Sequence, residues 1–87
     1  MISLFYGEKG KGKTKKLVEK ANELARTCLG HVIFLDDSND LIYKLNRNIR
    51  FINVLEFPID GTEGFLGFIC GAVSQDYDIE NVFIDGL

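Results

Sequence analysis

The chain reads Gly7-Glu8-Lys9-Gly10-Lys11-Gly12-Lys13-Thr14 close to its amino end. This stretch fits the pattern G-x-x-x-x-G-K-[ST] at every fixed position. An apolar, aromatic run precedes it at residues 2–6, and apolar residues with helical spacing begin directly after Thr14. A buried strand, a glycine-rich loop and a helix in this order predict a loop whose main-chain N–H groups surround an anion.

Each residue type in this loop has a physical reason to be there. Gly7 and Gly12 allow unusual backbone dihedral angles and let the main chain approach phosphate oxygens closely. The following helix directs unpaired N–H groups and the positive end of its dipole toward the same place. We therefore predict that residues 7–14 bind a nucleoside triphosphate, with Lys13 as a catalytic residue on the β- and γ-phosphates and Thr14 as a ligand of Mg²⁺. A glycine-rich turn that only caps a helix is the alternative, but such a turn needs no Gly-Lys-Thr triplet.

Apolar patterns along the rest of the chain predict alternating strands and helices. The expected strands are residues 2–6, 31–35, 49–56 and 82–85. Two longer helices are expected, from Thr14 to Gly30 and over residues 62–75. A short helix between the second and third strands is expected to be capped by Asp37 or Ser38 and to bury Leu41, Ile42 and Leu45. This alternation indicates a three-layer α/β/α fold with a mostly parallel sheet of about four strands. The order of the strands stays open.

The two long predicted helices each carry an apolar face. The first face consists of Leu17, Ala21, Leu24, Ala25 and Cys28, and the second of Phe65, Phe68, Ile69 and Ala72. In the second helix, Gly64, Gly67 and Gly71 form a stripe of small residues that is expected to allow close packing.

Composition favours a small soluble protein with an anionic ligand. The chain has 87 residues, which limits it to one domain, and its net charge of −3 with a pI near 5.0 argues against a nucleic-acid binder. Six of its ten basic residues nevertheless lie within residues 9–20. Such a local excess of positive charge suits a nucleotide better than an extended polyanion.

Sequence features also indicate a cytoplasmic location. No apolar run approaches the roughly 18 residues that span a bilayer, and the amino end lacks the pattern of a signal peptide. Cys28 and Cys70 lie far apart in apolar stretches, so both are predicted to be buried free thiols.

Residues 7–14 and 82–85 together resemble the Walker A and Walker B motifs of the P-loop NTPase superfamily. In that superfamily an aspartate at the end of the Walker B strand holds Mg²⁺, usually through water, beside the hydroxyl group of the Walker A threonine. The resemblance implies that Thr14 and Asp85 form this pair. Asp36 and Asp37 compete with Asp85, because ligands of such sheets bind at the carboxyl ends of the strands.

The chain departs from the family pattern at several positions. Gly86 follows Asp85, where many ATP-hydrolysing members carry a catalytic glutamate. Glu56, expected at the end of the third strand, is a weak candidate to replace it and is otherwise a surface residue. The base-reading N-K-x-D motif of GTPases is absent from the sequence, and Glu8 stands where the ParA/MinD-like variant has an extra lysine. ATP is the expected nucleotide, with GTP as the alternative. The subfamily is therefore left open.

Three functions remain as hypotheses. Residues 1–87 are expected to form the amino-terminal, nucleotide-binding part of a larger P-loop domain, with ATPase activity in the complete protein. A small-molecule kinase of the same superfamily is the second hypothesis. The third is a non-catalytic module that keeps the loop and forms homo-oligomers, since a chain ending on a strand would leave an apolar sheet edge exposed.

Overall fold

The computed structural model describes residues 2–7, 12–27, 29–57, 61–75 and 78–85. Its elements are β1 (Ser3–Gly7), α1 (Lys13–Thr27), β2 (His31–Asp36), a 3-10 turn η1 (Ile42–Lys44), β3 (Ile49–Asn53), a second 3-10 turn η2 (Val54–Glu56), α2 (Gly61–Ser74) and β4 (Ile79–Asp85). Within these ranges, neither α-helix combines the length and the apolar character needed to cross a bilayer.

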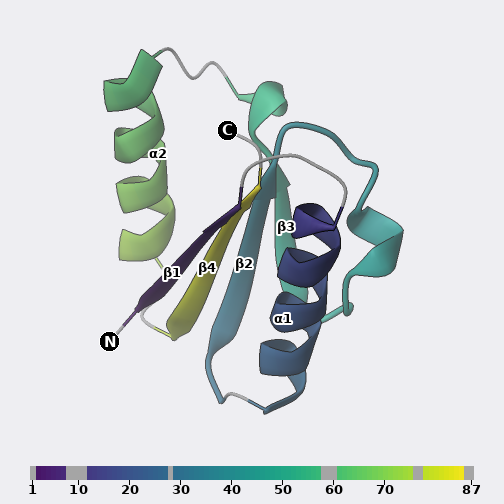
Figure 1. Ribbon diagram of the computed structural model, residues 1–87. Coiled ribbons are helices and arrows are strands. Elements are labelled where there is room, and N and C mark those ends of the chain that lie inside the picture. The colour runs from purple at the N-terminus through teal and green to yellow at the C-terminus, as the bar shows by residue number, and fades with distance from the viewer. Residues whose placement is uncertain (1, 8–11, 28, 58–60, 76–77, 86–87) are drawn as a thin grey trace.

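The four strands form one sheet in the order β1-β4-β2-β3, and every neighbouring pair is parallel. The helices α1 and α2 pack on opposite faces of this sheet (Figure 1). The predicted α/β architecture with a parallel sheet of about four strands is therefore confirmed. The last strand, β4, lies inside the sheet between β1 and β2, so the outer strands among the described residues are β1 and β3.

A row of four phenylalanines crosses the whole sheet beneath α1. Register places Phe5 opposite Phe83, Phe83 opposite Phe34, and Phe34 opposite Phe51. Their ring centroids are separated by 4.5, 6.0 and 6.4 Å in that order, with nearly parallel ring planes. Because all four side chains point to one face, this row forms the centre of the core between the sheet and α1.

Helix α1 covers the phenylalanine row with the predicted apolar face. Ala21 is fully buried, and Leu17, Leu24 and Ala25 pack around it while half-buried. Val18 is buried as well, although the predicted face did not include it, because the buried stripe of a helix is wider than one residue per turn. Cys28 lies outside the described residues.

Helix α2 packs on the opposite face, against apolar side chains of β2 and β4. Phe65, Phe68 and Ile69 contact this core as predicted. The glycine stripe does not pack closely, because a Cβ atom built on Gly67 or Gly71 would meet nothing within 4 Å. Cys70 is exposed on the same helix, so its predicted burial was wrong: apolar neighbours in sequence do not place a residue on the buried side.

The strand β1 is at the edge of the sheet and is not buried as predicted. Its residues Leu4 and Tyr6 expose 62% and 57% of their surface, whereas Phe5 points to the other face and is half-buried. An apolar run marks a strand, but it does not tell whether both faces of that strand are covered.

The connection between β2 and β3 is a 3-10 turn instead of the expected short helix. Its N-cap position is Leu41, which makes no side-chain capping bond, and the Ser38 hydroxyl accepts a bond from the Asp40 N–H instead. Leu41 and Leu45 are buried as predicted, whereas Ile42 is largely exposed. Three residues per turn do not keep all three of these side chains on one side.

Two glycine-to-alanine substitutions should change stability in opposite directions. A Cβ atom at Gly30 would collide with the main-chain oxygen of Asp78 and the side chain of Glu80. Gly30→Ala should therefore cost about 1–3 kcal/mol of unfolding free energy. Gly67→Ala meets open space inside a helix and should add about 0.5–1 kcal/mol. Urea denaturation followed by circular dichroism measures both, and equal midpoints for the two variants would contradict the packing described at Gly30.

Candidate phosphate and metal site

The carboxyl ends of the four strands carry a row of glycine and polar residues. Gly7 of β1 pairs with Asp85 of β4, and Asp36 of β2 pairs with Asn53 of β3. The pairing of β2 with β4 one residue earlier places Asp36 beside Asp85. Each of these residues is two positions beyond a phenylalanine of the core row, so the side chains of Asp85 and Asp36 point to the α1 face. Both carboxylates are only 1% exposed.

The beginning of α1 lies at the same end of the sheet. Gly12 immediately precedes the helix with a φ of +87°, a conformation that favours glycine and fits the predicted unusual dihedral angles at this position. Gly7, in contrast, ends β1 without a positive φ. The Lys16 N–H donates to the Gly12 carbonyl over 3.0 Å, which closes the first turn of the helix. The N–H groups before it in the helix have no acceptor one turn earlier within α1, as at any helix start.

Thr14 and Asp85 meet directly at this end of the sheet. The Thr14 hydroxyl lies 3.3 Å from Oδ1 and 3.5 Å from Oδ2 of Asp85, and the contact is partly buried. These residues are 71 positions apart in the sequence. The fold therefore brings together the two side chains that were predicted to share Mg²⁺.

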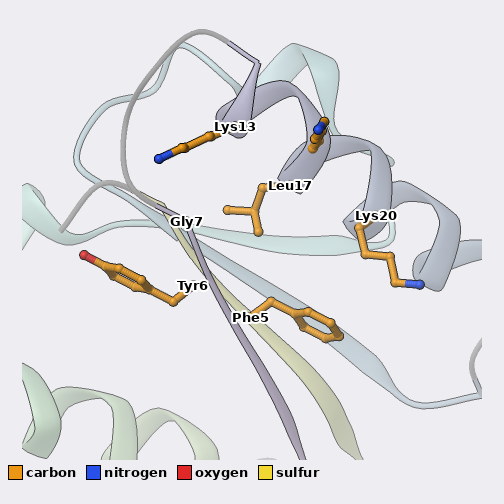
Figure 2. A pocket seen from close by; sticks show the side chains of 7 residues that line it. Phe5, Tyr6, Gly7, Lys13, Leu17 and Lys20 are labelled. Atoms are coloured by element: carbon orange, nitrogen blue, oxygen red, sulfur yellow. The ribbon is translucent and has the colours of Figure 1, made fainter.

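Lys13 is the first residue of α1 and lies on the β1 side of the helix. Figure 2 shows its side chain extending above Gly7, with Tyr6 below and to one side. Lys13, Gly7 and Tyr6 line the same open groove. The remaining predicted loop residues, Glu8, Lys9, Gly10 and Lys11, lie outside the described residues, so their part in binding stays a prediction.

The competing aspartates have a different surrounding. The Asp36 carboxylate accepts a hydrogen bond from the Asp37 N–H over 2.7 Å, which stabilises the turn after β2. Of the three candidates, Asp85 is the one for which contact with the Thr14 hydroxyl is observed. Within the described ranges, no group of three or more His, Cys, Asp or Glu side chains could hold a metal ion alone. A cation at this place would need further ligands from water or from a bound phosphate.

Glu56 does not occupy the position expected for it. Strand β3 ends at Asn53, whose side-chain oxygen accepts a bond from the Leu55 N–H over 3.0 Å and starts η2. Glu56 is the exposed last residue of that turn, three positions beyond the strand end. On the β3 side, the neighbour of Asp36 in the polar row is therefore Asn53, which the sequence patterns did not indicate as a site residue.

Comparison with known proteins gives no family for this chain. No protein-family model, no curated protein and no solved structure matches it. The interpretation of the site therefore depends on the chain's own residues and their geometry.

Proposed function

We propose that this chain binds a nucleoside triphosphate, ATP in preference to GTP, together with Mg²⁺, as the nucleotide-binding part of a P-loop ATPase. The observation that carries the proposal is the contact between Thr14 and Asp85 at the start of α1. The sequence motif by itself suggests a phosphate loop. The Asp85 carboxylate, held against the Thr14 hydroxyl at the start of α1, adds a second oxygen ligand for the cation that accompanies a triphosphate.

Electrostatics at this end of the sheet suit a polyphosphate with its metal. The start of α1 carries the equivalent of about half a positive charge, and the Lys13 ammonium adds a full one. Asp85 and Asp36 bring two negative charges within the adjacent strands. Phosphate oxygens would lie nearest to the helix and Lys13, and a divalent cation would lie between them and the carboxylates.

The oxygens of Thr14 and Asp85 fit the chemistry of Mg²⁺. This ion prefers oxygen ligands at about 2.1 Å and usually keeps several waters while it shares one or two protein groups with substrate phosphates. Adjacent ligands of an octahedral ion at that distance are about 3 Å apart. The separation of 3.3 Å between the Thr14 hydroxyl and Asp85 Oδ1 is close to this value.

Each residue would have a definite task in phosphoryl transfer. Lys13 and the first N–H groups of α1 would hold the phosphate chain and stabilise charge on its oxygens, which is the main demand of this reaction. Thr14 and Asp85 would hold the metal, which neutralises charge on the phosphates when it is bound. The buried position of Asp85 keeps its carboxylate in one place.

Isothermal titration calorimetry with ATP, with and without Mg²⁺, tests the metal part of this proposal. We expect saturable binding of Mg-ATP by the unaltered chain and about tenfold weaker binding without the metal. Asp85→Asn should remove most of this dependence on Mg²⁺, because the amide can still accept the Thr14 bond but is a poor ligand for a hard cation.

Two further variants separate the candidate carboxylates. Asp37→Asn removes the same charge two strands away from β1 and should leave the Mg²⁺ dependence unchanged. If Asp36→Asn abolished it while Asp85→Asn did not, Asp36 would be the metal carboxylate. Absence of heat with both Mg-ATP and Mg-GTP would contradict nucleotide binding itself.

A further inference from the structure

Strand β1 is an outer strand of the sheet in the part of the chain that the structure describes. Among the described residues, β1 pairs only with β4. An outer strand of a sheet can add a further strand through main-chain N–H and C=O groups that face away from the sheet. Proteins usually protect such an edge with charged residues, proline or a bulge, but residues 2–7 contain no charged residue and no proline, and their pairing with β4 is regular.

The two faces of this edge have different chemistry. On the face turned away from α1, the side chains of Ile2, Leu4 and Tyr6 form an exposed apolar strip. On the α1 face, a groove of about 460 Å³ runs between β1 and α1. The groove is lined by Phe5 and Leu17 and by two lysines of the helix, Lys16 and Lys20, here called the rim lysines. Figure 2 shows Phe5 of β1 together with Leu17 and Lys20 of α1.

The spacing of the two rim lysines matches the repeat of a strand. Lys16 and Lys20 are one helical turn apart, which is about 6 Å along the axis. Side chains on one face of a strand repeat every two residues, about 6.6 Å. Carboxylates at alternate positions of an added strand could thus face both lysines. Among the described residues, Lys20 makes a long contact of 4.0 Å with the exposed Glu23.

We propose that the edge of β1 binds an extended acidic segment of a partner protein as a fifth strand. Its Asp or Glu residues, at alternate positions, face Lys16 and Lys20, and the apolar residues between them cover Leu4 and Tyr6. Main-chain hydrogen bonds to β1 supply affinity and the alternating side chains supply specificity, as in other cases of strand addition.

Charge argues against two other occupants. A second copy could pair through β1 in an antiparallel, two-fold arrangement. This would bring both α1 helices to the same side of the new strand pair, where the two sets of rim lysines would repel each other. A single-stranded nucleic acid could contact the lysines through phosphates, but it would leave the strand edge and Leu4 without partners. The net charge of −3 also disfavours a nucleic acid.

Peptide binding to the unaltered chain tests the proposal. The probes are a peptide of about ten residues that alternates glutamate with valine, and a twin with lysine in place of glutamate. We expect the acidic peptide to bind at least about tenfold more tightly by fluorescence anisotropy, and to lose affinity as salt is raised. Hydrogen exchange of the main-chain N–H groups of β1 should slow when it binds.

Variants on the two faces identify the edge. Lys16→Glu combined with Lys20→Glu should weaken the acidic peptide by about tenfold or more and improve the lysine twin. Leu4→Glu should weaken the acidic peptide, whereas Leu55→Glu, at another exposed leucine, should not.

Four results would overturn the inference: equal binding of both peptides, binding without slowed exchange in β1, competition by an oligonucleotide, or dimerisation through β1. None of these experiments alters Lys13, Thr14 or Asp85, so their failure would leave the proposed nucleotide site in place.

Discussion

Lys13→Ala is expected to weaken binding of Mg-ATP by about 100-fold, because a hydrogen bond to a charged group contributes about 1.5–3 kcal/mol and this lysine would contact two phosphates. Lys13 is the first residue of α1, and its side chain extends over the end of β1. The ammonium group on the flexible four-carbon side chain of Lys13 can reach a phosphate that lies at the start of α1. Other lysines on α1 begin further from it.

Titration calorimetry of matched variants measures this effect. Lys15→Ala removes an equally charged, exposed side chain two positions along the same helix and should change the affinity by less than about threefold, through long-range charge alone. Circular dichroism before each titration shows whether the helix has formed. Equal affinities for Lys13→Ala and Lys15→Ala would indicate that ATP is attracted by the general positive charge of α1 and not by a phosphate loop.

Much of the site could be predicted from the sequence because its central parts are local. The glycine, the lysine and the threonine that precede and begin α1 are consecutive, and the strand before them is adjacent in the chain. The pairing of Thr14 with Asp85 was expected only from the resemblance to the Walker A and Walker B motifs. In the structure these two side chains are in contact, at the edge where the carboxyl ends of the parallel strands meet.

The strand register had a signal in the sequence that was not used. Each of the four strands carries a phenylalanine two residues before its last position, in Phe5-Tyr6-Gly7, Phe34-Leu35-Asp36, Phe51-Ile52-Asn53 and Phe83-Ile84-Asp85. In the sheet, the phenylalanines pair with one another and the last residues form the polar row. This repeat places the end of the third strand at Asn53 and excludes Glu56 from the strand end.

Features that depend on distant neighbours could not be predicted in this way. Strand order follows from the packing of both helices on the sheet, and no local pattern in β1 or β4 shows which of them lies at the edge. The exposure of Leu4 and of Cys70 has the same origin, because each lies in an apolar stretch whose covering depends on elements far away in sequence. Local sequence patterns predict where strands and helices form, whereas packing between distant parts of the chain decides which of their side chains are buried.

Phe83→Ala is expected to have the largest effect on folding. Phe83 is 0% exposed in the inner strand β4 and stacks against Phe5 on one side and Phe34 on the other. Removing such a ring costs about 3–5 kcal/mol, from lost burial and from the cavity left behind. A small domain has only about 5 kcal/mol or slightly more in total, so this variant should be largely unfolded at room temperature.

Thermal and urea denaturation followed by circular dichroism test this prediction, with Tyr43→Ala as the control. Tyr43 is 97% exposed, so losing its ring should change the unfolding free energy by less than about 0.5 kcal/mol. Phe83→Leu keeps an apolar side chain and should fall between the two. Because Phe83 lies two residues before Asp85, a destabilised β4 should also lose the contact with Thr14, and Mg-ATP added at saturation should partly restore folding. A Phe83→Ala variant as stable as the unaltered chain would mean that the aromatic row does not hold the sheet and α1 together.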